Sequence, residues 1–355
     1  MEDECFIAEA IASIPAPDAS WEERAWARLD SLTKPPRSLG YLEELAQRLA
    51  VLQGSERPSI PRKTIVLMAG DHGVTAQGVS PYPSEVTAQM VENFVEGGAA
   101  INQLATHAGA NVLVVDVGVA HHVPPADGLL AARVRNGTAD MTQGAAMTRE
   151  QAAAAVRVGI RVVGDLVREG VDIMGTGDMG IGNTTASAAV VSVLAGADPA
   201  QVVGPGTGLD PDGVARKADV VRRAIEVNGP DVADPLDVLA KVGGLEIAGL
   251  AGVVIGAASC GVPVVSDGYI SGAATLAALR LAPAARPWVF ASHRSAEPGH
   301  RLVLEVLGLR PVLELDMRLG EGTGAALAIE VMDAACAVMR GMATFAEAGV
   351  SEAGA

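Results

Sequence analysis

Short apolar runs recur along the chain from residue 61 onward, and each of them ends near a glycine or an acidic residue. The runs are TIVLMAGDHG, NVLVVDVG, DIMGTGDMGIG, VPVVSDG, WVFASH and a sixth candidate, PVLELDM. Apolar runs of this length, bounded by turn residues, predict buried strands. Segments with helical signals lie between them, and this alternation of strand and helix implies right-handed parallel crossovers. We therefore expect an α/β fold with a three-layer, doubly wound, mainly parallel sheet of the Rossmann-like kind.

Helix boundaries can be assigned at several points of the chain. Ser20 is a capping residue type at the start of SWEERAWARLDSL, and the prolines of KPPRSLG end that helix. A second helix is expected over Tyr41 to Gln53. Thr148 and Gln151 form a capping box ahead of AAAAVRVGIRVVGDLVREG, where Gly170 supplies the stop.

Composition and charge narrow the classes of protein. Lys and Arg number 26 against 42 Asp and Glu, which gives a formal charge of −16. This balance disfavours a nucleic-acid or anionic-membrane partner, because such binding depends on clustered cations. The three cysteines are scattered and form no CxxC pair, and no apolar run reaches membrane-spanning length. We expect an untargeted, cytoplasmic protein.

In a doubly wound sheet, ligands gather at the carboxyl ends of the strands, so the residues after each apolar run are the candidates for a site. These are Asp71 to Gly73, Asp116, Gly177 to Asn183, Asp267 and Gly268, Ser292 and His293, and Glu321.

The segment GTGDMGIGNTT, residues 175–185, is a candidate phosphate site. Its glycines follow a strand and precede a helix, whose N-terminal N–H groups attract anions. The spacing of Gly175, Gly177 and Gly180 matches GxGxxG, but the alternative is a turn whose glycines only permit tight packing. A nicotinamide dinucleotide site would need this unit to come first, and here at least two strands precede it. Lys217, in the expected helix DPDGVARKADVVRRA, either reaches a phosphate or lies on a solvated face.

The sequence contains none of the motifs typical of zinc enzymes, acyl-transfer enzymes or P-loop NTPases. His72, the pair His121 and His122, and His293 lack the HExxH or His/carboxylate spacing of a zinc site. No GxSxG and no P-loop sequence occurs. We expect a site without metal.

Glu321 lies between two glycines in MRLGEGTGAALA, residues 317–328. A carboxylate at the centre of a phosphate loop would repel the ligand, which favours a catalytic role as a general base. Partial burial beside an apolar ligand would raise its pKa toward the working pH. A solvated loop glutamate remains the alternative on the residues alone.

Eight blocks in a fixed order carry a resemblance that covers nearly the whole chain. The blocks are KPPRSLGYLEELA, GDHGV, VVDVGV, GDMGIGNTTASAA, KADVVRRAI, DVLAKVGGLEIAGLAGVVIGAASCGVPVVSDG, SHRSAEPG and MRLGEGTGAALA. With them the chain resembles the nicotinate-nucleotide:dimethylbenzimidazole phosphoribosyltransferases, which make the lower nucleotide loop of cobalamin. The resemblance implies transfer of phosphoribosyl from nicotinate mononucleotide to 5,6-dimethylbenzimidazole, giving α-ribazole 5′-phosphate and nicotinate. It also implies no cofactor and a homodimer.

The resemblance also implies site residues. Glu321 would be the catalytic base, because it matches the glutamate of the family's RLGEG motif. The substrate-binding residues would be Asp178, Gly180, Gly182, Asn183, Lys217, Asp267, Gly268 and Ser292 for phosphoribosyl, and Tyr82, Met90 and Leu319 for benzimidazole. The chain departs from the family at Asp178, where Glu is common, and at Arg37, where Gly is common.

Two domains are expected from the sequence. Residues 1–60 and 321–355 should form a small helical domain beside a phosphoribosyl-binding α/β domain of residues 61–320. Two other functions stay open on the residues: a non-catalytic nucleotide-binding regulator on the same sheet, and an NAD-dependent dehydrogenase, which the position of GxGxxG disfavours.

Overall fold

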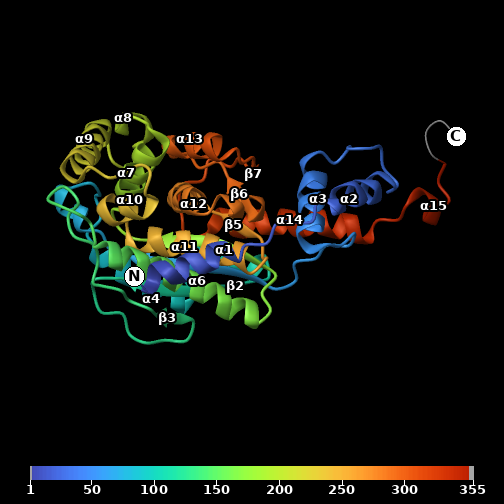
Figure 1. Cartoon of the computed structure of the whole chain (residues 1–355), viewed down its shortest axis with the longest axis horizontal. Helices are drawn as coiled ribbons and strands as arrows, with labels where there is room; N and C mark the ends of the chain where they lie inside the picture. Colours follow the sequence, from blue (N-terminus) through green and yellow to red (C-terminus); the bar gives the residue numbers. More distant parts are fainter. Residues whose placement is uncertain (1, 352–355) are drawn as a thin grey trace.

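Seven parallel strands form the central sheet of the protein (Figure 1). The computed structural model describes residues 2–351; Met1 and residues 352–355, which belong to the expected helical domain, lie outside the described residues. The strands are β1 Lys63–Gly70, β2 Ala110–Gly118, β3 Leu129–Ala131, β4 Ile173–Met179, β5 Val264–Ser266, β6 Val289–His293 and β7 Pro311–Leu313. Each neighbouring pair in the order β3-β2-β1-β4-β5-β6-β7 is parallel.

The course of the chain across the sheet reverses between β1 and β4. From β1 the chain moves outward through β2 to β3, returns to the other side of β1 as β4, and then continues outward to β7. The connections that leave β1 and β4 therefore diverge at the carboxyl ends of these two strands and leave a crevice between them. The site described below adjoins this crevice.

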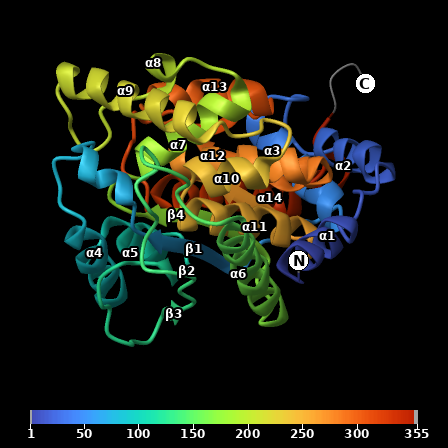
Figure 2. The same ribbon diagram turned by 60° about the vertical axis from the view of Figure 1, so that its left-hand side comes forward.

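Helices cover both faces of the sheet (Figures 1 and 2). The helices are α1 Glu2–Ala12, α2 Ser20–Asp30, α3 Tyr41–Gln53, η1 Gly73–Gln77, α4 Glu85–Glu96, α5 Ala100–His107, α6 Arg149–Arg168, α7 Asn183–Ala195, α8 Pro199–Val202, α9 Pro211–Asn228, α10 Pro235–Val242, α11 Leu245–Ser259, α12 Tyr269–Leu281, η2 Pro283–Trp288, α13 Pro298–Leu307, α14 Thr323–Gly341 and α15 Phe345–Ala348.

The side chains of each strand alternate between two cores. On β1, Val66 and Met68 belong to the core that includes α6, α7, α11 and α12, whereas Ile65 and Leu67 belong to the core of α4, α5 and α14. Because successive strand residues point to opposite faces, a strand buried on both sides is apolar throughout. This is why the strands appear in the sequence as continuous apolar runs.

The helices before the first strand separate into two groups. The pair α2 and α3 packs with α14 in a lobe at one end of the molecule (Figure 1). Helix α1 lies apart from this lobe, along α6 and α11 (Figures 1 and 2). The division of the chain at residues 60 and 320 stays a prediction.

Most of the expected elements are confirmed. All six apolar runs contain a strand, α3 has the expected bounds, and Thr148 caps α6 in a capping box with Gln151. The expectation for Ser20 was wrong: Ala19 is the N-cap of α2, and Asp18 Oδ1 instead accepts a hydrogen bond from the Ser20 N–H at 2.9 Å. Strand β3 was not expected, because its residues are largely exposed and do not belong to a buried apolar run. Among residues 2–351, no helix is both long and apolar enough to cross a bilayer.

The helices α6 and α11 are in backbone contact. A Cβ atom added to Gly159 of α6 would overlap the carbonyl oxygen of Gly249 on α11, and one added to Gly252 would overlap the carbonyl oxygen of Val156. Glycine therefore allows these two helices to approach more closely than larger residues would.

We predict opposite effects for two glycine substitutions in α6. Gly159→Ala should destabilise the protein by about 1–3 kcal/mol, because the added methyl group overpacks the contact with α11. Gly164→Ala, where a Cβ would meet nothing within 4 Å, should stabilise by about 0.5–1 kcal/mol through helix propensity. Urea unfolding of both variants measures this. Equal effects of the two substitutions would contradict the close contact.

Candidate active site

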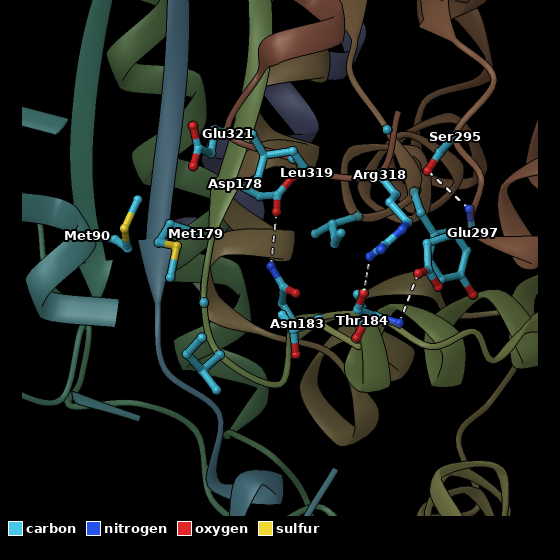
Figure 3. Close-up of a pocket in the computed structure, with 18 of the residues that line it drawn as sticks. Met90, Asp178, Met179, Asn183, Thr184, Ser295, Glu297, Arg318, Leu319 and Glu321 are labelled. Carbon is cyan, nitrogen blue, oxygen red and sulfur yellow. Dashed lines mark hydrogen bonds between the residues drawn. The ribbon is translucent and has the colours of Figure 1, made fainter. Parts of the chain in front are cut away.

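A cavity of about 450 Å³ lies beyond the carboxyl ends of β4, β5 and β6 (Figure 3). Six parts of the chain form its wall: residues 82–90 with the start of α4, the turn from β4 into α7, residues 206–207, residues 268–270 after β5, residues 295–297 and residues 318–321. Its lining residues are Tyr82, Val86, Met90, Asp178, Met179, Gly180, Ile181, Asn183, Thr184, Gly206, Thr207, Gly268, Tyr269, Ile270, Ser295, Glu297, Arg318, Leu319, Gly320 and Glu321.

The loop that carries Glu321 turns sharply against β4. Gly320, Glu321 and Gly322 all have positive φ angles, of 89°, 63° and 92°. A non-glycine residue in this region is strained by roughly 1 kcal/mol or more, so the surroundings must hold it in place. The Glu321 N–H donates to the carbonyl oxygen of Asp178 on β4 at 3.3 Å, and a Cβ atom on Gly177 would overlap the Glu321 carbonyl.

Asp267, which follows β5, holds the end of the same loop by accepting hydrogen bonds from its backbone. Its buried carboxylate accepts a hydrogen bond from the Ala325 N–H at 2.9 Å, in the first turn of α14. The N–H groups of Gly322 and Gly324 also face it. Burial raises the pKa of Asp267 to about 7, against the opposing effect of these backbone donors. Asp267 therefore acts as an N-terminal anchor for α14 and for the residues just before it.

The Glu321 carboxyl group points into the cavity and is held at one oxygen. The residue is only 6% exposed, and its Oε2 accepts from the Ile101 N–H in the first turn of α5 at 3.2 Å. Burial raises the pKa of Glu321 against the lowering effect of the Ile101 N–H, and the nearby Asp267 raises it further. Within residues 2–351, no group donates a hydrogen bond to Oε1. This oxygen can therefore take a proton from a ligand.

Asp178 lies in the middle of the cavity wall. Its Oδ2 accepts from the side-chain amide of Asn183 at 3.0 Å, whereas its Oδ1 is buried and has no partner among the described residues. Burial raises its pKa well above the ordinary value, and so do the charges of Asp267, Glu246 and Glu321, while Asn183 opposes the shift. A protonated Asp178 would be able to donate a hydrogen bond as well as accept one.

One end of the cavity is polar. Arg318 Nη1 donates to the Gly206 carbonyl at 2.9 Å, and the Gly206 N–H donates to Glu297 Oε1 at 2.9 Å. Behind this loop, Lys217 Nζ donates to Thr184 Oγ1 at 2.7 Å. Burial lowers the pKa of Lys217 to about 8, against the charge of Glu297. The polar end thus combines two cations with the N-terminus of α7.

The opposite end of the cavity is apolar. Met90 and Met179 lie there beside Glu321, while Thr184, Ser295, Glu297 and Arg318 lie across the cavity (Figure 3). Tyr82 and Leu319 form the mouth and are 51% and 58% exposed. A ligand with one aromatic end and one anionic end would fit this arrangement.

The structure brings most of the expected site residues together. Those that line the cavity are Tyr82, Met90, Asp178, Gly180, Asn183, Gly268, Leu319 and Glu321. The other four, Gly182, Lys217, Asp267 and Ser292, are not among the lining residues. Ser292 is buried and donates to the Asp267 carbonyl oxygen at 2.7 Å. Their contact with substrate stays a prediction; Lys217 donates to Thr184, which lines the cavity.

Several lining residues were not expected from the sequence. Arg318 and Glu297 belong to the blocks MRLGEGTGAALA and SHRSAEPG, which carry the family resemblance. Each is a charged residue a few positions after a strand, and this position could have indicated a site residue. Gly206 and Thr207 belong to a loop that follows no strand, so the rule of carboxyl ends could not identify them.

The glycines of GTGDMGIG serve packing within the chain. A Cβ on Gly175 would lie 2.9 Å from Cβ of Ala325, and one on Gly180 would overlap the Gly70 carbonyl oxygen. Gly177 packs against the backbone of Glu321. Each glycine of the GxGxxG spacing therefore allows another segment of the chain to pack closely against it. All three glycines thus permit tight packing, and Gly180, Asn183 and Thr184 also line the cavity. Phosphate binding by this segment stays a prediction.

No group of three or more His, Cys, Asp and Glu side chains within residues 2–351 has the arrangement of a metal site.

Comparison with known proteins identifies relatives across nearly the whole chain. A family model described as phosphoribosyltransferase matches residues 14–350. The nicotinate-nucleotide–dimethylbenzimidazole phosphoribosyltransferase of Desulforamulus reducens is 52% identical over 348 residues, covering 98% of this chain and 99% of its own. That of Chloroflexus aggregans is 55% identical and covers 92% of each chain. A crystal structure under the same enzyme name from Thermus thermophilus superposes with a TM-score of 0.90, at 50% identity, over 94% of this chain and 99% of the other.

The raised pKa of Asp267 predicts a pH-dependent effect of Asp267→Asn. The folded state favours the protonated acid, so wild-type stability from this group is present below pH 4 and is lost as the pH rises through 7. The unfolding free energy of wild type relative to Asp267→Asn should therefore fall by roughly 2–3 kcal/mol between pH 5 and pH 8. Chemical denaturation at both pH values measures it. A difference that is the same at both would show that Asp267 is already ionised at pH 5.

Proposed function

The chain belongs to the phosphoribosyltransferase family whose model spans residues 14–350, and from that membership we propose how its cavity performs the reaction. The protein is an enzyme that moves the phosphoribosyl group of nicotinate mononucleotide to 5,6-dimethylbenzimidazole. The products are nicotinate and α-ribazole 5′-phosphate, a precursor of the cobalamin nucleotide loop. The regulator and dehydrogenase alternatives are not favoured, because the relatives carry this enzyme name.

The observation that carries the proposal is the position of Glu321 in a cavity with two unlike ends. The carboxyl group lies at the apolar end, beside Met90 and Met179, and the cations lie at the other end (Figure 3). A benzimidazole ring at the apolar end and a ribose phosphate at the polar end would meet near Asp178, in the middle.

The chemistry of the two bases explains why one carboxylate suffices. When nicotinate leaves the ribose, its cationic ring nitrogen takes the electrons of the glycosidic bond and becomes neutral. The leaving group therefore needs little acid assistance. An oxocarbenium-like transition state is expected, as in glycoside cleavage. The attacking imidazole nitrogen would become cationic unless the other ring nitrogen lost its proton. Glu321 Oε1 takes that proton in our proposal. The scheme calls for no metal or redox cofactor.

The setting of Glu321 suits this role. The Ile101 N–H fixes Oε2, so that Oε1 is directed at the ring without rotation of the carboxyl group. The raised pKa makes the ionised carboxylate a stronger base than an exposed glutamate. Leu319 and Tyr82 at the mouth would lie against the ring and exclude water from the proton transfer.

The phosphate would lie at the polar end. The N-terminus of α7 at Asn183 and Thr184 supplies N–H groups and a partial positive charge. Arg318 lines the cavity, and Lys217 lies directly behind Thr184. These local cations matter because the chain as a whole carries a formal charge of −16, which repels anions at long range.

We also propose that the enzyme works in the cytoplasm as a homodimer that acts on these small molecules and on neither nucleic acid nor membrane. Cys5, Cys260 and Cys336 are all free thiols, which suits a reducing compartment. The lobe of α2 and α3 extends from the α/β body (Figure 1), and a second copy could pack against it.

Glu321→Gln should lower kcat by about 10²–10⁴-fold and change the KM of either substrate little, because the amide keeps its size but accepts no proton. Nicotinate release under saturating substrates measures kcat. The matched control is Glu314→Gln, an exposed carboxylate on the preceding segment that pairs with Arg294 and should behave as wild type. Near-normal turnover of Glu321→Gln would rule out the assignment of the base.

Arg318→Gln should raise the KM for nicotinate mononucleotide by about 10–100-fold, which is the loss of one or two charge-assisted hydrogen bonds. Nicotinate riboside, which has no phosphate, should be a poor substrate that the substitution affects little. Arg294→Gln, on the same side of the molecule but paired with Glu314, is the control. Equal losses for both substrates would show that Arg318 does not contact the phosphate.

A further inference from the structure

We propose that His72 and Glu246 form a buried positioning pair that fixes the turn from β4 into α7, and this role rests on the function proposed above. His72 follows β1 and Glu246 lies in the first turn of α11. Their Nε2 and Oε1 atoms are 2.7 Å apart, and both side chains are almost wholly buried. Neither residue lines the cavity. The pair acts through the backbone that it contacts, and the charge of Glu246 also raises the pKa of Asp178.

The pair forms the floor beneath the turn. A Cβ on Gly180 would lie 3.3 Å from His72 Nε2, and a Cβ on Gly182 would lie 3.3 Å from His72 Cβ. On the far side, the backbone of Gly244 is so close that a Cβ there would lie 2.7 Å from Glu246 Oε2. Glycine at these positions leaves no side chain between the pair and the turn, so a displacement of the imidazole moves the turn directly.

Other contacts also hold the turn: Gly180 packs against the Gly70 carbonyl, and Gly182 packs against Thr75. The Ile181 N–H donates to Thr87 Oγ1 on α4 at 3.1 Å, and Asn183 holds Asp178. Gly180, Ile181 and Asn183 all line the cavity. Their positions therefore depend on the His72–Glu246 pair together with Thr87 and the backbone of Gly70.

The charges of the two groups depend on each other. Burial lowers the pKa of His72, but Glu246 raises it through its charge and its hydrogen bond, as does Asp71, and the net shift is upward. Glu246 from α11 and Asp71 from the same segment are the titratable groups that face the imidazole; the turn packed above it, Gly180 to Gly182, contributes none. Neither His72 Nδ1 nor Glu246 Oε2 has another partner within residues 2–351. One hydrogen bond joins the two side chains, and the raised pKa of His72 favours the imidazolium form beside the Glu246 carboxylate.

The sign of the pH effect follows from this shift. Because the folded-state pKa of His72 lies above its ordinary value of 6.5, the pair is fully formed below that value and is lost as the pH rises through the raised pKa. In Glu246→Gln, only the charge of Asp71 still opposes the effect of burial, so His72 loses its proton at a lower pH. A purely structural role would lower stability in the variant without moving any pH profile.

The first test is the charge of His72 in the wild-type protein. Nitrogen chemical shifts of the imidazoles, assigned by the signal lost in His72→Gln, should show the imidazolium form at pH 6 in wild type and the neutral form in Glu246→Gln. A neutral His72 at pH 6 in wild type would overturn the proposal, whatever the enzyme's turnover. This measurement needs no activity, so it fails or succeeds independently of the proposed function.

The second test is the pH profile of kcat/KM for nicotinate mononucleotide. Glu246→Gln and His72→Gln should each lose about 10–100-fold, as expected for a small displacement of substrate-positioning groups. The double variant should lose no more than either single one, since the pair acts as a unit. The alkaline limb of the profile should move to lower pH in Glu246→Gln, and an unmoved limb would contradict the pair's role.

A matched control lies at the other end of β1. Asp333→Asn removes the charge from the pair that Lys63 Nζ forms with Asp333 Oδ2 at 2.6 Å, and it should leave the profile unchanged. If Asp333→Asn shifts the limb as Glu246→Gln does, the effect is general and the proposal is wrong. If wild type produces no nicotinate at all, the proposed function fails, and calorimetric affinity for nicotinate mononucleotide in the same variants then tests the pair.

Discussion

The backbone contact between β4 and the loop before α14 is the constraint on which the site depends. Glu321 can face the cavity only because Gly177 leaves room for its carbonyl group and because glycines on both sides accept positive φ angles. Asp267 then anchors the start of α14 and prevents the loop from relaxing. A strained residue is held by the folded core, so the chemistry of the loop depends on the packing of the whole sheet.

Burial of acidic groups gives the site its electrostatic character. Asp178, Asp267 and Glu321 all have raised pKa values, and in each case burial is the first cause. The cations are placed at the opposite end, where Lys217 and Arg318 hold the loop at residues 204–207. A short distance therefore separates a region that favours proton transfer from one that favours an anion, although the chain as a whole is acidic.

The sequence could predict the fold because its signals are local. Strands buried on both faces appear as apolar runs, and capping residues such as Thr148 act within one turn. Helix α2 shows the limit of this rule, since Asp18 rather than Ser20 supplies the oxygen that accepts at its start. The strand-end rule located Glu321 and Asp178, but the partner of His72 lies 174 residues away, and only the tertiary structure reveals it.

The mouth of the cavity should tolerate substitution better than the wall around Glu321 and Asp178. That wall is made of glycine contacts and buried acids, so a larger side chain there would displace β4 or the loop before α14. Tyr82 and Leu319, in contrast, are more than half exposed and carry little of the packing. If these two side chains contact the acceptor as proposed above, exchanging them would alter which aromatic base the enzyme accepts while Glu321 and its supports stay unchanged.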